Sequence, residues 1–512
     1  MNHNRALALF HHAEEQPAKT AIVDAGRQLS FASLASKVRE LAGEMAALGI
    51  AQGNRVGVML PNGADFVITQ QALFMLGAVF SPINIYYQPA EVAHLAASCE
   101  LHWIIAPPNL VERIHPLRGS QIQSLRGMMM LERGHLKNEG HSASQPRPLV
   151  ALAVVQSSDV AMLLNTSATT GKSKGVPLTA ANLAANYDRT PAWLGLDGSD
   201  VILCALPLYN TFGLNQCINA MLVTGATMVL LPRFESHHVL DAIHQHRCTF
   251  LPAVPTMLQK LFDDPYATPW RLQSLRLIMT GGAPVPAALL RRVQQLSGSS
   301  TTVLTGYGLT EATALVTLTS VELGSDGEIV RPRTIGKVLD GMHLSILDEG
   351  GAEVPLGTIG EIAIRGPNVM VGYYNAPDDT AIALAGDWLH SGDLGYIDED
   401  GYAYIVDRLK DVIIRGGQNI YPADIEEVLY HCEGVAEAAV IGRSHEMLGE
   451  EPIAFVAFKP GAKASLSDLE KACSEQLAPF KRPVEFRILP SLPKGPTGKI
   501  LRRQIRADQP SA

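Results

Sequence analysis

The sequence predicts an α/β protein with a large N-terminal domain of parallel-rich sheets covered by helices, followed by a small α+β C-terminal domain. Helix and strand patterns alternate through the first 400 residues, which is typical of mainly parallel sheets. Short strands joined by turns follow after about residue 340 and indicate a small antiparallel, barrel-like subdomain. The chain has 512 residues, 47% hydrophobic and 18% charged, which is an ordinary globular composition.

The first elements show the alternation. Apolar residues recur at spacings of four and three in an amphipathic helix that Gly49 ends, namely Leu34, Val38, Leu41, Met45 and Leu48. Buried strands and a helix then alternate, and we expect strand 56–60, helix 63–76, and strands 78–80, 201–206, 228–231 and 275–279. This part of the chain therefore predicts a helix-covered sheet.

The pattern changes in the last third of the chain. We expect hairpin strands first, and then a helix and two more strands, at 344–347, 360–365, 401–406, 422–430, 438–441 and 453–458. The expected break between the two domains falls near 407–410. It predicts a large domain over residues 1–407 and a small domain over residues 408–512.

Charge and cysteine usage exclude several classes of function. Lysine and arginine number 41 against 50 acidic residues, so the formal net charge is −9 and no basic field exists to hold nucleic acid or an anionic membrane. The six cysteines have no paired spacing, which argues against a zinc ribbon, a redox motif or a disulfide framework. A reducing, cytoplasmic location is the expectation, and the N-terminal segment lacks the apolar core of a signal peptide.

One stretch, residues 201–232, has no charged side chain and is long enough to span a bilayer. Polar residues, glycines and a proline interrupt it throughout, which would be costly in lipid. We therefore expect a buried strand, a loop, a short helix and another buried strand, and no transmembrane segment.

A donor-rich loop at 165–176 carries the strongest functional signal. It follows an apolar run and precedes a helix that is expected to begin near Thr179. Hydroxyl side chains, glycines and the lysines Lys172 and Lys174 in so short a loop can wrap the oxygens of a polyphosphate. The loop is not a Walker A motif, because Thr166 stands where that motif requires a glycine.

The loop resembles the phosphate loop of the adenylate-forming superfamily, which comprises acyl-CoA synthetases, aryl-CoA ligases, luciferases and nonribosomal peptide adenylation domains. The usual form of that loop is Ser/Thr-Ser-Gly-Thr-Thr-Gly-x-Pro-Lys-Gly, and this chain departs from it at Ala168 and Ser173. The resemblance implies that ATP phosphates are bound by Thr166, Ser167, Thr169, Thr170, Gly171, Lys172 and Lys174.

Further motifs follow in the order of the superfamily, so the resemblance covers nearly the whole chain. The segment Tyr-Gly-Leu-Thr-Glu at 307–311 resembles its Tyr-Gly-x-Thr-Glu motif. The resemblance implies an aromatic face for adenine at Tyr307 and a hydroxyl directed at phosphate at Thr310. It also implies that Glu311 supplies a hard oxygen ligand for Mg²⁺.

Two more matches concern the nucleoside and the domain boundary. A Thr-Gly-Gly-Ala-Pro segment resembles the adenine-side loop, in which Gly282 and Ala283 let the backbone approach the base. A Ser-Gly-Asp segment resembles the ribose-binding motif, so the carboxylate of Asp393 would hold the ribose hydroxyls with support from Arg408. Lys410 stands where the superfamily has its hinge residue.

The C-terminal region resembles the mobile small domain of the superfamily. The segment Pro-Lys-Gly-Pro-Thr-Gly-Lys ends at Lys499, whose positive charge would meet the negative charge that develops between the attacking carboxylate and the α-phosphate. Rotation at Lys410 would withdraw Lys499 and bring a second loop toward the path by which the acceptor thiol enters. Its consecutive glycines, Gly416 and Gly417, would let a pantetheine arm pass close to the backbone.

The implied reaction has two halves and consumes ATP. A carboxylate attacks the α-phosphorus of Mg·ATP, releases pyrophosphate and forms an acyl-adenylate, and a thiol then displaces AMP. The thiol belongs to coenzyme A or to the phosphopantetheine of a carrier protein. No insertion precedes the small domain of the kind that hinders coenzyme A in fatty acyl-AMP ligases, which favours coenzyme A.

The acid is specified less closely. A Pro-Leu-Tyr-Asn-Thr-Phe-Gly segment resembles the one beside the acyl pocket of the superfamily, with Asn210 in place of the usual His. No aspartate is positioned to anchor an amino group and no arginine to bind a second carboxylate, so a monocarboxylic fatty or aryl acid fits best. The expected pocket residues are Tyr209, Asn210, Thr211, Met257, Gly281 and Gly306.

Other classes of function remain as alternatives. A catalytically silent nucleotide-binding relative would have lost Lys499, Glu311 or Asp393, and all three are present. A zinc site is suggested by Glu235, His237, His238, His244, His246 and Cys248. An amphipathic helix there would, however, direct the paired histidines to different sides. The missing Walker glycine argues against a P-loop ATPase or kinase.

Overall fold

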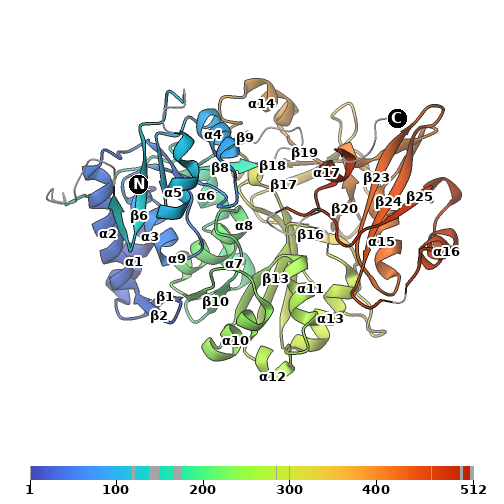
Figure 1. The fold of residues 1–512 in the computed structure, drawn as a ribbon, viewed down its shortest axis with the longest axis horizontal. Helices are drawn as coiled ribbons and strands as arrows, with labels where there is room; N and C mark the ends of the chain where they lie inside the picture. The colour runs from blue at the N-terminus through green and yellow to red at the C-terminus, as the bar shows by residue number, and fades with distance from the viewer. Residues whose placement is uncertain are drawn as a thin grey trace.

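The computed structural model describes residues 2–117, 122–137, 149–166, 174–283, 285–298, 300–462, 464–495 and 500–507. Three sheets organise this part of the chain, two in a large N-terminal part and one in a small C-terminal part (Figure 1). The predicted fold class is confirmed, with helices and parallel strands first, antiparallel strands next and an α+β unit last.

The first sheet has seven strands in the order β7-β6-β5-β3-β4-β8-β9. Its strands are β3 (Arg55–Val58), β4 (Val79–Pro82), β5 (Trp103–Ala106), β6 (Gly127–Glu132), β7 (His135–Lys137), β8 (Val160–Thr166) and β9 (Lys174–Thr179). The central pairs are parallel, whereas β7 and β9 pair antiparallel at the two edges. The apolar runs expected at 56–60 and 78–80 are thus neighbouring parallel strands.

Helices α2 (Phe31–Ala47) and α3 (Ala64–Met75) pack against each other and connect the first sheet to the second. Ser30 caps α2, accepting a hydrogen bond from the backbone N–H of Ser33 at 3.2 Å. Every residue of α3 except Asp65 is buried, as expected for a helix covered on all sides. Other helices of this part are α1 (Leu7–Glu15), α4 (Pro89–Ser98), α5 (Pro108–Ile114), α6 (Ala180–Asn186) and α7 (Thr190–Leu194).

The second sheet has thirteen strands and begins with a parallel run. This run is built from β1 (Thr20–Asp24), β10 (Val201–Cys204), β11 (Thr227–Leu230), β12 (Phe250–Ala253), β13 (Leu277–Gly281) and β14 (Thr302–Gly308), with β2 (Arg27–Ser30) antiparallel at the edge. The helices that accompany it are α10 (Ser236–His246), α11 (Pro255–Asp263), α12 (Pro269–Leu272) and α13 (Ala287–Ser297).

Antiparallel strands continue the second sheet beyond β14. They are β15 (Leu315–Ser320), β16 (Thr334–Val338), β17 (His343–Leu347), β18 (Gly360–Arg365), β19 (Leu389–Ile397) and β20 (Ala403–Arg408), with α14 (Pro377–Ala383) between β18 and β19. The predicted hairpins occur here, because β17, β18, β19 and β20 pair in succession.

The charge-free stretch 201–232 folds as expected. It forms β10, the short helices α8 (Thr211–Gly213) and α9 (Ala220–Thr224) with a π-helical segment Leu214–Asn219 between them, and then β11. In the part of the chain that the structure describes, no helix combines the length and apolar character needed to cross a membrane.

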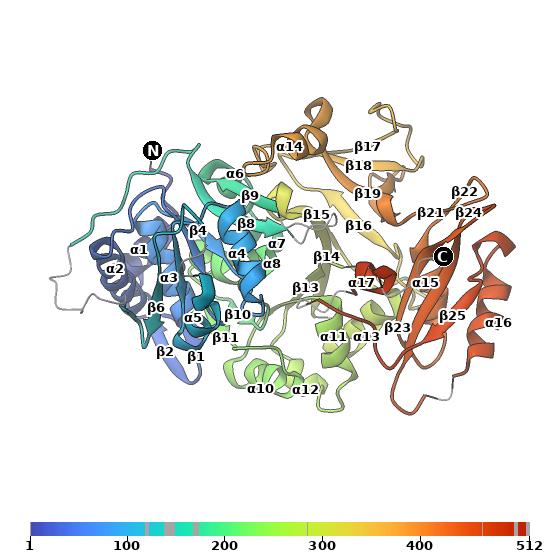
Figure 2. The ribbon, with the colours of Figure 1, turned by 45° about the horizontal axis from the view of Figure 1, so that its top comes forward.

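The C-terminal part has its own sheet (Figure 2). It also has its own hydrophobic core. Its strands are β21 (Ile413–Arg415), β22 (Gln418–Ile420), β23 (Val435–His445), β24 (Gly449–Phe458) and β25 (Glu485–Ile488), and its helices are α15 (Pro422–His431), α16 (Leu466–Gln476) and α17 (Arg502–Ala507). The separate core supports the predicted division into a large and a small domain.

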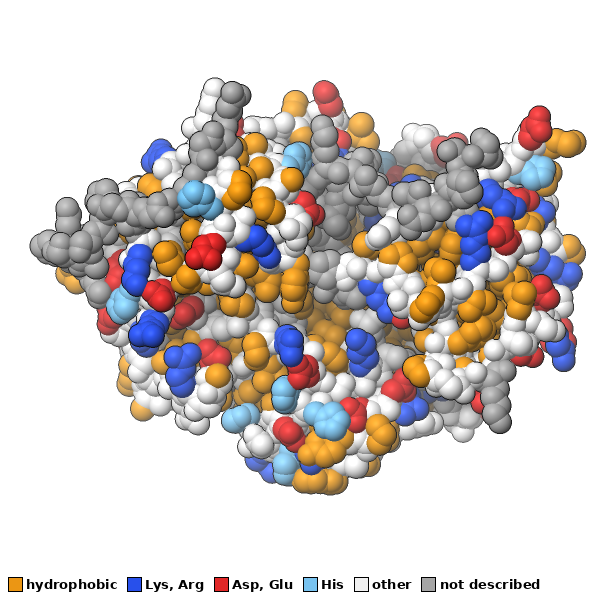
Figure 3. Space-filling model, in the orientation of Figure 1, with side chains coloured by type: hydrophobic (Ala, Val, Ile, Leu, Met, Phe, Trp, Pro, Cys, Tyr) orange, Lys and Arg blue, Asp and Glu red, His pale blue; other side chains and the backbone are white. Residues whose placement is uncertain are grey.

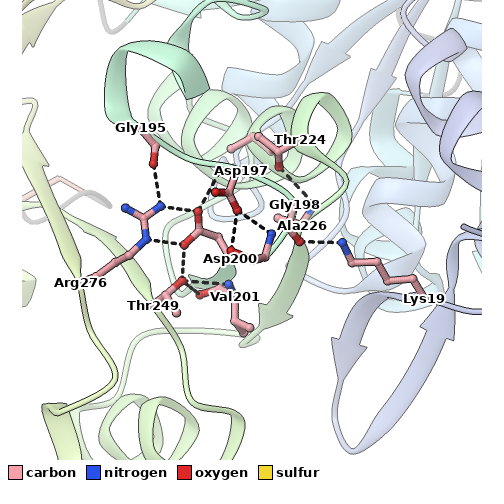
Figure 4. A network of polar contacts seen from close by, with 12 residues as sticks. Lys19, Gly195, Asp197, Gly198, Asp200, Val201, Thr224, Ala226, Thr249 and Arg276 are labelled. Atoms are coloured by element: carbon pink, nitrogen blue, oxygen red, sulfur yellow. Dashed lines mark hydrogen bonds and ion pairs between the residues drawn. The ribbon is translucent and has the colours of Figure 1, made fainter.

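A closed polar network secures the base of the large domain (Figure 4). The carboxylate of Asp200, 1% exposed, accepts hydrogen bonds from Arg276 Nε at 2.8 Å and from Thr249 Oγ1 at 2.6 Å. The backbone N–H of Asp197 donates to the other carboxylate oxygen of Asp200 at 2.9 Å. A buried carboxylate is tolerated only when it is paired and hydrogen-bonded in this way, so the network fixes the loop before β10.

Candidate functional site

A cleft of about 2660 Å³ lies at the carboxyl ends of the parallel strands and extends to the small domain. The end of β8 and the loops that follow β12, β13 and β14 contribute to its walls, which is where ligands bind in open α/β sheets. The space-filling view shows the molecule hollowed at the centre, with hydrophobic side chains on the floor (Figure 3). The small domain adds lining residues from α15 and α17.

Most of the predicted site residues within the described part of the chain line this cleft. They are Thr166, Lys174, Tyr209, Asn210, Thr211, Met257, Gly282, Ala283, Gly306, Tyr307, Thr310, Glu311, Asp393, Arg408 and Lys410. Three predicted residues do not line it, namely Gly281, Gly416 and Gly417. Six others lie outside the described residues, namely Ser167, Thr169, Thr170, Gly171, Lys172 and Lys499.

An aspartate–arginine pair faces the cleft from two neighbouring strands. Asp393 on β19 and Arg408 on β20 are register partners, and Arg408 Nε lies 2.8 Å from Asp393 Oδ1 in an ion pair. The hydroxyl of Tyr307 donates to Asp393 Oδ2 at 2.6 Å. Burial, and then the charge of Asp393, raise the pKa of Tyr307 well above its usual value, so the phenol stays a neutral donor. The three residues form one unit, a contact that their separate motifs did not reveal.

A second unit surrounds Glu311, in the short turn after β14. Its Oε1 accepts a hydrogen bond from the hydroxyl of Tyr373 at 2.9 Å, and its backbone carbonyl accepts one from the N–H of Met370 at 2.8 Å. Burial, and then the charge of Glu311, raise the pKa of Tyr373. No motif identified Tyr373 as a site residue, because its role depends on a contact across 62 positions of the chain.

The carboxylate of Glu311 fits the predicted role as a Mg²⁺ ligand. Mg²⁺ is usually held by one or two carboxylates together with substrate phosphates and water, so a single carboxylate facing the cleft is sufficient from the protein. Among the described residues, no group of three or more histidine, cysteine, aspartate or glutamate side chains could hold a metal ion by itself. The geometry therefore suits an ion that arrives with a nucleotide.

The predicted acid pocket is built around close backbone approaches. Gly281 and Gly306 are register partners on β13 and β14, and a Cβ on Gly281 would lie 2.7 Å from the carbonyl oxygen of Gly306. A Cβ on Gly306 would lie 2.6 Å from the carbonyl oxygen of Thr317. Gly281 therefore shapes the strand pair rather than lining the cleft itself, whereas Gly306 does both.

Thr211 and Tyr209, which follow β10, differ in their hydrogen bonding. The hydroxyl of Thr211 donates to the carbonyl oxygen of Thr313 at 2.8 Å and lies 2.8 Å from the hydroxyl of Tyr187. The hydroxyl of Tyr209 is buried with no hydrogen-bond partner among the described residues. Burial raises the pKa of Tyr209, so this phenol remains a neutral donor.

The predicted hinge lies at the junction of the two domains. Lys410 is in a short helical turn, Leu409–Asp411, directly after β20, and burial lowers its pKa. Asp411, the next residue, forms ion pairs with Arg502 at 3.3 Å and with Arg506 at 2.9 Å, both on α17. This contact places the helix that follows the Lys499 segment beside the hinge.

The two glycines predicted to line a thiol channel form the turn of a hairpin. Gly416 and Gly417 have φ values of +57° and +80° and connect β21 to β22. Two consecutive positive φ values favour glycine, because other residues are strained there. The turn therefore explains both glycines by backbone conformation.

The histidines around α10 do not gather into a metal site. His237 stacks on Tyr266 at 4.7 Å and His244 packs edge-on against Trp270 at 4.3 Å. His238 instead pairs with Glu235 at 2.9 Å. Histidine side chains are visible at the bottom of the molecule over α10 and α12 (Figure 3). These three rings thus have separate packing or charge partners, in agreement with the amphipathic helix predicted there.

Comparison with known proteins gives a consistent result over the whole chain. Residues 9–374 match the family of AMP-binding enzymes, and residues 424–499 match the AMP-binding enzyme C-terminal domain. Among curated proteins, the chain is 34% identical to the 3-(7a-methyl-1,5-dioxo-octahydro-1H-inden-4-yl)propanoyl:CoA ligase of Rhodococcus jostii, over 98% of both chains. It is 31% identical to the long-chain-fatty-acid–CoA ligase of Bacillus subtilis, over 96% of this chain and 92% of that one.

Solved structures agree with these matches. ATP-bound MatB from Rhodopseudomonas palustris is 31% identical, covers 99% of both chains and superposes with a TM-score of 0.90. The similarity therefore extends over both the large and the small domain.

Proposed function

The chain belongs to the AMP-binding enzyme family and is an acyl-CoA synthetase of the adenylate-forming superfamily, and from this premise we propose that its acid is a monocarboxylic one with an apolar fatty or aryl body. The enzyme is an acid–thiol ligase that forms an acyl-adenylate and uses coenzyme A as the acceptor. The choice of acid depends on the charges that line the cleft.

The arginines of the cleft carry this proposal. Within the described part of the chain, every arginine that lines the cleft is paired with a carboxylate of the protein, and these arginines are Arg233, Arg291, Arg292, Arg331, Arg333, Arg408, Arg502 and Arg506. A second carboxylate on the substrate would need an available cation to offset its desolvation. A second carboxylate would have to compete with these protein carboxylates for the arginines, which favours an acid with a single carboxylate.

Apolar lining supports the second half of the proposal. Phe212, Phe234, Val254, Met257 and Val285 line the cleft. An acid with a hydrocarbon or aromatic body would bury its surface against these side chains. The matched relatives named for a fused-ring propanoate and for long-chain fatty acids act on acids of this kind.

We assign the reaction steps to this chain's own residues as follows. Asp393 and Arg408 would hold the ribose, with Tyr307 keeping the carboxylate oriented while its ring borders the adenine site. Lys174, with Ser167, Thr169, Thr170, Gly171 and Lys172 of its loop and with Thr166 and Thr310, would hold the phosphates. Mg²⁺ held by Glu311 would supply positive charge against the phosphate oxygens.

Lys499 would then stabilise the charge that develops as the acid carboxylate attacks the α-phosphorus. Pyrophosphate leaves with the electrons of the broken P–O bond, and the acyl-adenylate remains. Rotation at Lys410 would next give coenzyme A access to the acyl-adenylate. The thiolate of coenzyme A would then attack the acyl carbon, and AMP would leave.

The test is ATP-dependent pyrophosphate release, with hydroxylamine trapping of the acyl-adenylate, over a panel of acids. The panel contains fatty acids, aryl acids and fused-ring propanoates, each matched by a dicarboxylic acid of the same length. We expect apolar monocarboxylic acids to be used with kcat/KM at least about tenfold above their dicarboxylic partners. Preference for the dicarboxylic acids would overturn the proposed substrate class. A complete absence of pyrophosphate release would instead indicate a silent relative.

A matched pair of lysine variants tests the division of labour between the half-reactions. Lys499→Ala should lower acyl-adenylate formation by about 100-fold or more, while transfer from supplied acyl-adenylate to coenzyme A changes little. Lys494→Ala is the control, because Lys494 belongs to the same segment but pairs with Glu437. Equal loss of both half-reactions in Lys499→Ala would contradict the role of Lys499 in adenylate formation alone. Transfer of the acyl group to a carrier protein, and not to coenzyme A, would contradict coenzyme A as the acceptor.

A further inference from the structure

Two groups that the proposed reaction needs are engaged by one segment, residues 372–380, between β18 and β19. Lys174, at the start of β9, forms an ion pair with Asp379 of α14. Glu311 accepts its hydrogen bond from Tyr373 of the same segment at 2.9 Å. The partner of the predicted phosphate ligand, Asp379, and the partner of the predicted Mg²⁺ ligand, Tyr373, therefore lie within one stretch of seven residues.

The segment is fixed in this position by contacts on both sides. The N–H of Tyr374 donates to the carbonyl oxygen of Gly175 on β9 at 2.8 Å, next to Lys174. The N–H of Tyr373 donates to Thr380 Oγ1 at 2.9 Å, which ties the start of the segment to α14. Figure 1 shows α14 at the top of the molecule beside β9. The ion pair is thus part of an ordered arrangement.

Lys174 is held by a carboxylate and by an aromatic face. Its ammonium lies 4.9 Å from the ring centroid of Tyr373, whose face attracts a cation. Its side chain is 22% exposed, and the carboxylate of Asp379 is 44% exposed. A partly exposed pair of this kind contributes little stability and can exchange its anion readily.

We propose that the carboxylate of Asp379 binds Lys174 at the position that a phosphate oxygen takes when nucleotide binds. Mg·ATP must therefore displace this carboxylate from Lys174. The inference rests on the proposed function, because it assumes that Lys174 meets phosphate. Asp379 therefore weakens nucleotide binding and keeps the lysine positioned while the site is empty. Tyr373 keeps its contacts with both groups and couples the lysine to Glu311.

Equilibrium binding of α,β-methylene-ATP with Mg²⁺, measured by calorimetry, tests the proposal without turnover. Asp379→Asn should lower the Kd of the analogue about three- to tenfold, because the competing charge is gone. Asp378→Asn is the matched control, because Asp378 is adjacent on the same helix, and it should change Kd by less than about twofold. An unchanged or higher Kd in Asp379→Asn overturns the proposal.

Two further measurements separate displacement from a structural effect. In a Lys174→Met background, Asp379→Asn should change Kd by less than about twofold, because its effect acts through the lysine. Adenosine, which has no phosphates, should bind wild type and Asp379→Asn equally. Tightening of adenosine, or a full effect without Lys174, overturns the proposal. If wild type binds neither ligand, the proposed function itself fails, which is a different result from equal binding by wild type and variant.

Discussion

Two aspartates, Asp200 and Asp393, are buried to a similar extent beside an arginine but lie in regions of different character. The carboxylate of Asp200 is 1% exposed and receives donors from Arg276, Thr249 and the backbone of Asp197. The carboxylate of Asp393 is 5% exposed, pairs with Arg408 and Tyr307, and lines the cleft. The first network is closed by the protein, and the second faces the space that a ligand would occupy.

The difference shows that burial alone does not assign a role to a carboxylate. Asp200 lies in the loop before β10, and its donors come from several parts of the large domain (Figure 4). Asp393 lies on β19 and its partner Arg408 on the antiparallel neighbour β20, and both line the cleft. We therefore expect substitutions at the first site to change stability, and substitutions at the second to change nucleotide use.

The largest effect is expected for Asp200→Ala. Removal of the buried carboxylate deprives Thr249 of its short hydrogen bond and Arg276 Nε of its acceptor, so the free energy of unfolding should fall by about 3 kcal/mol. Denaturant unfolding measures this change, and the Kd for ATP of the folded variant should remain within about twofold. Asp197→Asn, at an exposed position of the same loop, is the control and should cost less than about 1 kcal/mol. A small loss in Asp200→Ala would contradict the closed-network interpretation.

Asp393→Asn should show the opposite profile. Loss of charge-assisted hydrogen bonds to the ribose should lower kcat/KM for ATP about 100-fold, whereas the free energy of unfolding should fall by less than in Asp200→Ala. Steady-state pyrophosphate release and denaturant unfolding give the two numbers. Asp400→Asn, on the exposed turn between β19 and β20, should leave both nearly unchanged. If nucleotide use in Asp393→Asn remained normal, the ribose assignment would be wrong.

The smallest effect concerns Asp407, beside Arg408 at the domain junction. Its carboxylate accepts hydrogen bonds from the N–H groups of Arg408 at 2.7 Å and Ala423 at 2.9 Å. Burial nevertheless raises its pKa from 3.8 to about 6. Between these two pH values the folded chain binds more protons than the unfolded chain, so this residue's contribution to stability falls as pH rises from about 4 to about 6.

Asp407→Asn removes this titration. We expect the variant to be more stable than wild type by about 1 to 2 kcal/mol at pH 8, because wild type then carries a buried charge. The difference should shrink as pH is lowered toward 4. Thermal or denaturant unfolding across this pH range measures it. A difference that grows as pH falls would mean that the charged carboxylate is stabilised at the junction.

The residues recognised from sequence were those whose chemistry is visible locally. The alternation of apolar runs predicted the parallel strands and helices, because local hydrophobic periodicity reports burial. The Tyr-Gly-Leu-Thr-Glu and Ser-Gly-Asp segments predicted residues that the fold brings to one cleft. Gly281, Gly416 and Gly417 were predicted as pocket or channel residues, yet the structure explains them by strand approach and turn conformation.

The sequence by itself determined the fold class, the two-domain organisation and the adenylate-forming chemistry, because apolar periodicity and short motifs are local properties of the chain. Only the tertiary structure decided which side chains meet. It joined Tyr307 to Asp393, Tyr373 to Glu311 and Asp379 to Lys174 across 86, 62 and 205 positions. These contacts depend on the pairing of distant strands, and no local pattern encodes which strands become neighbours.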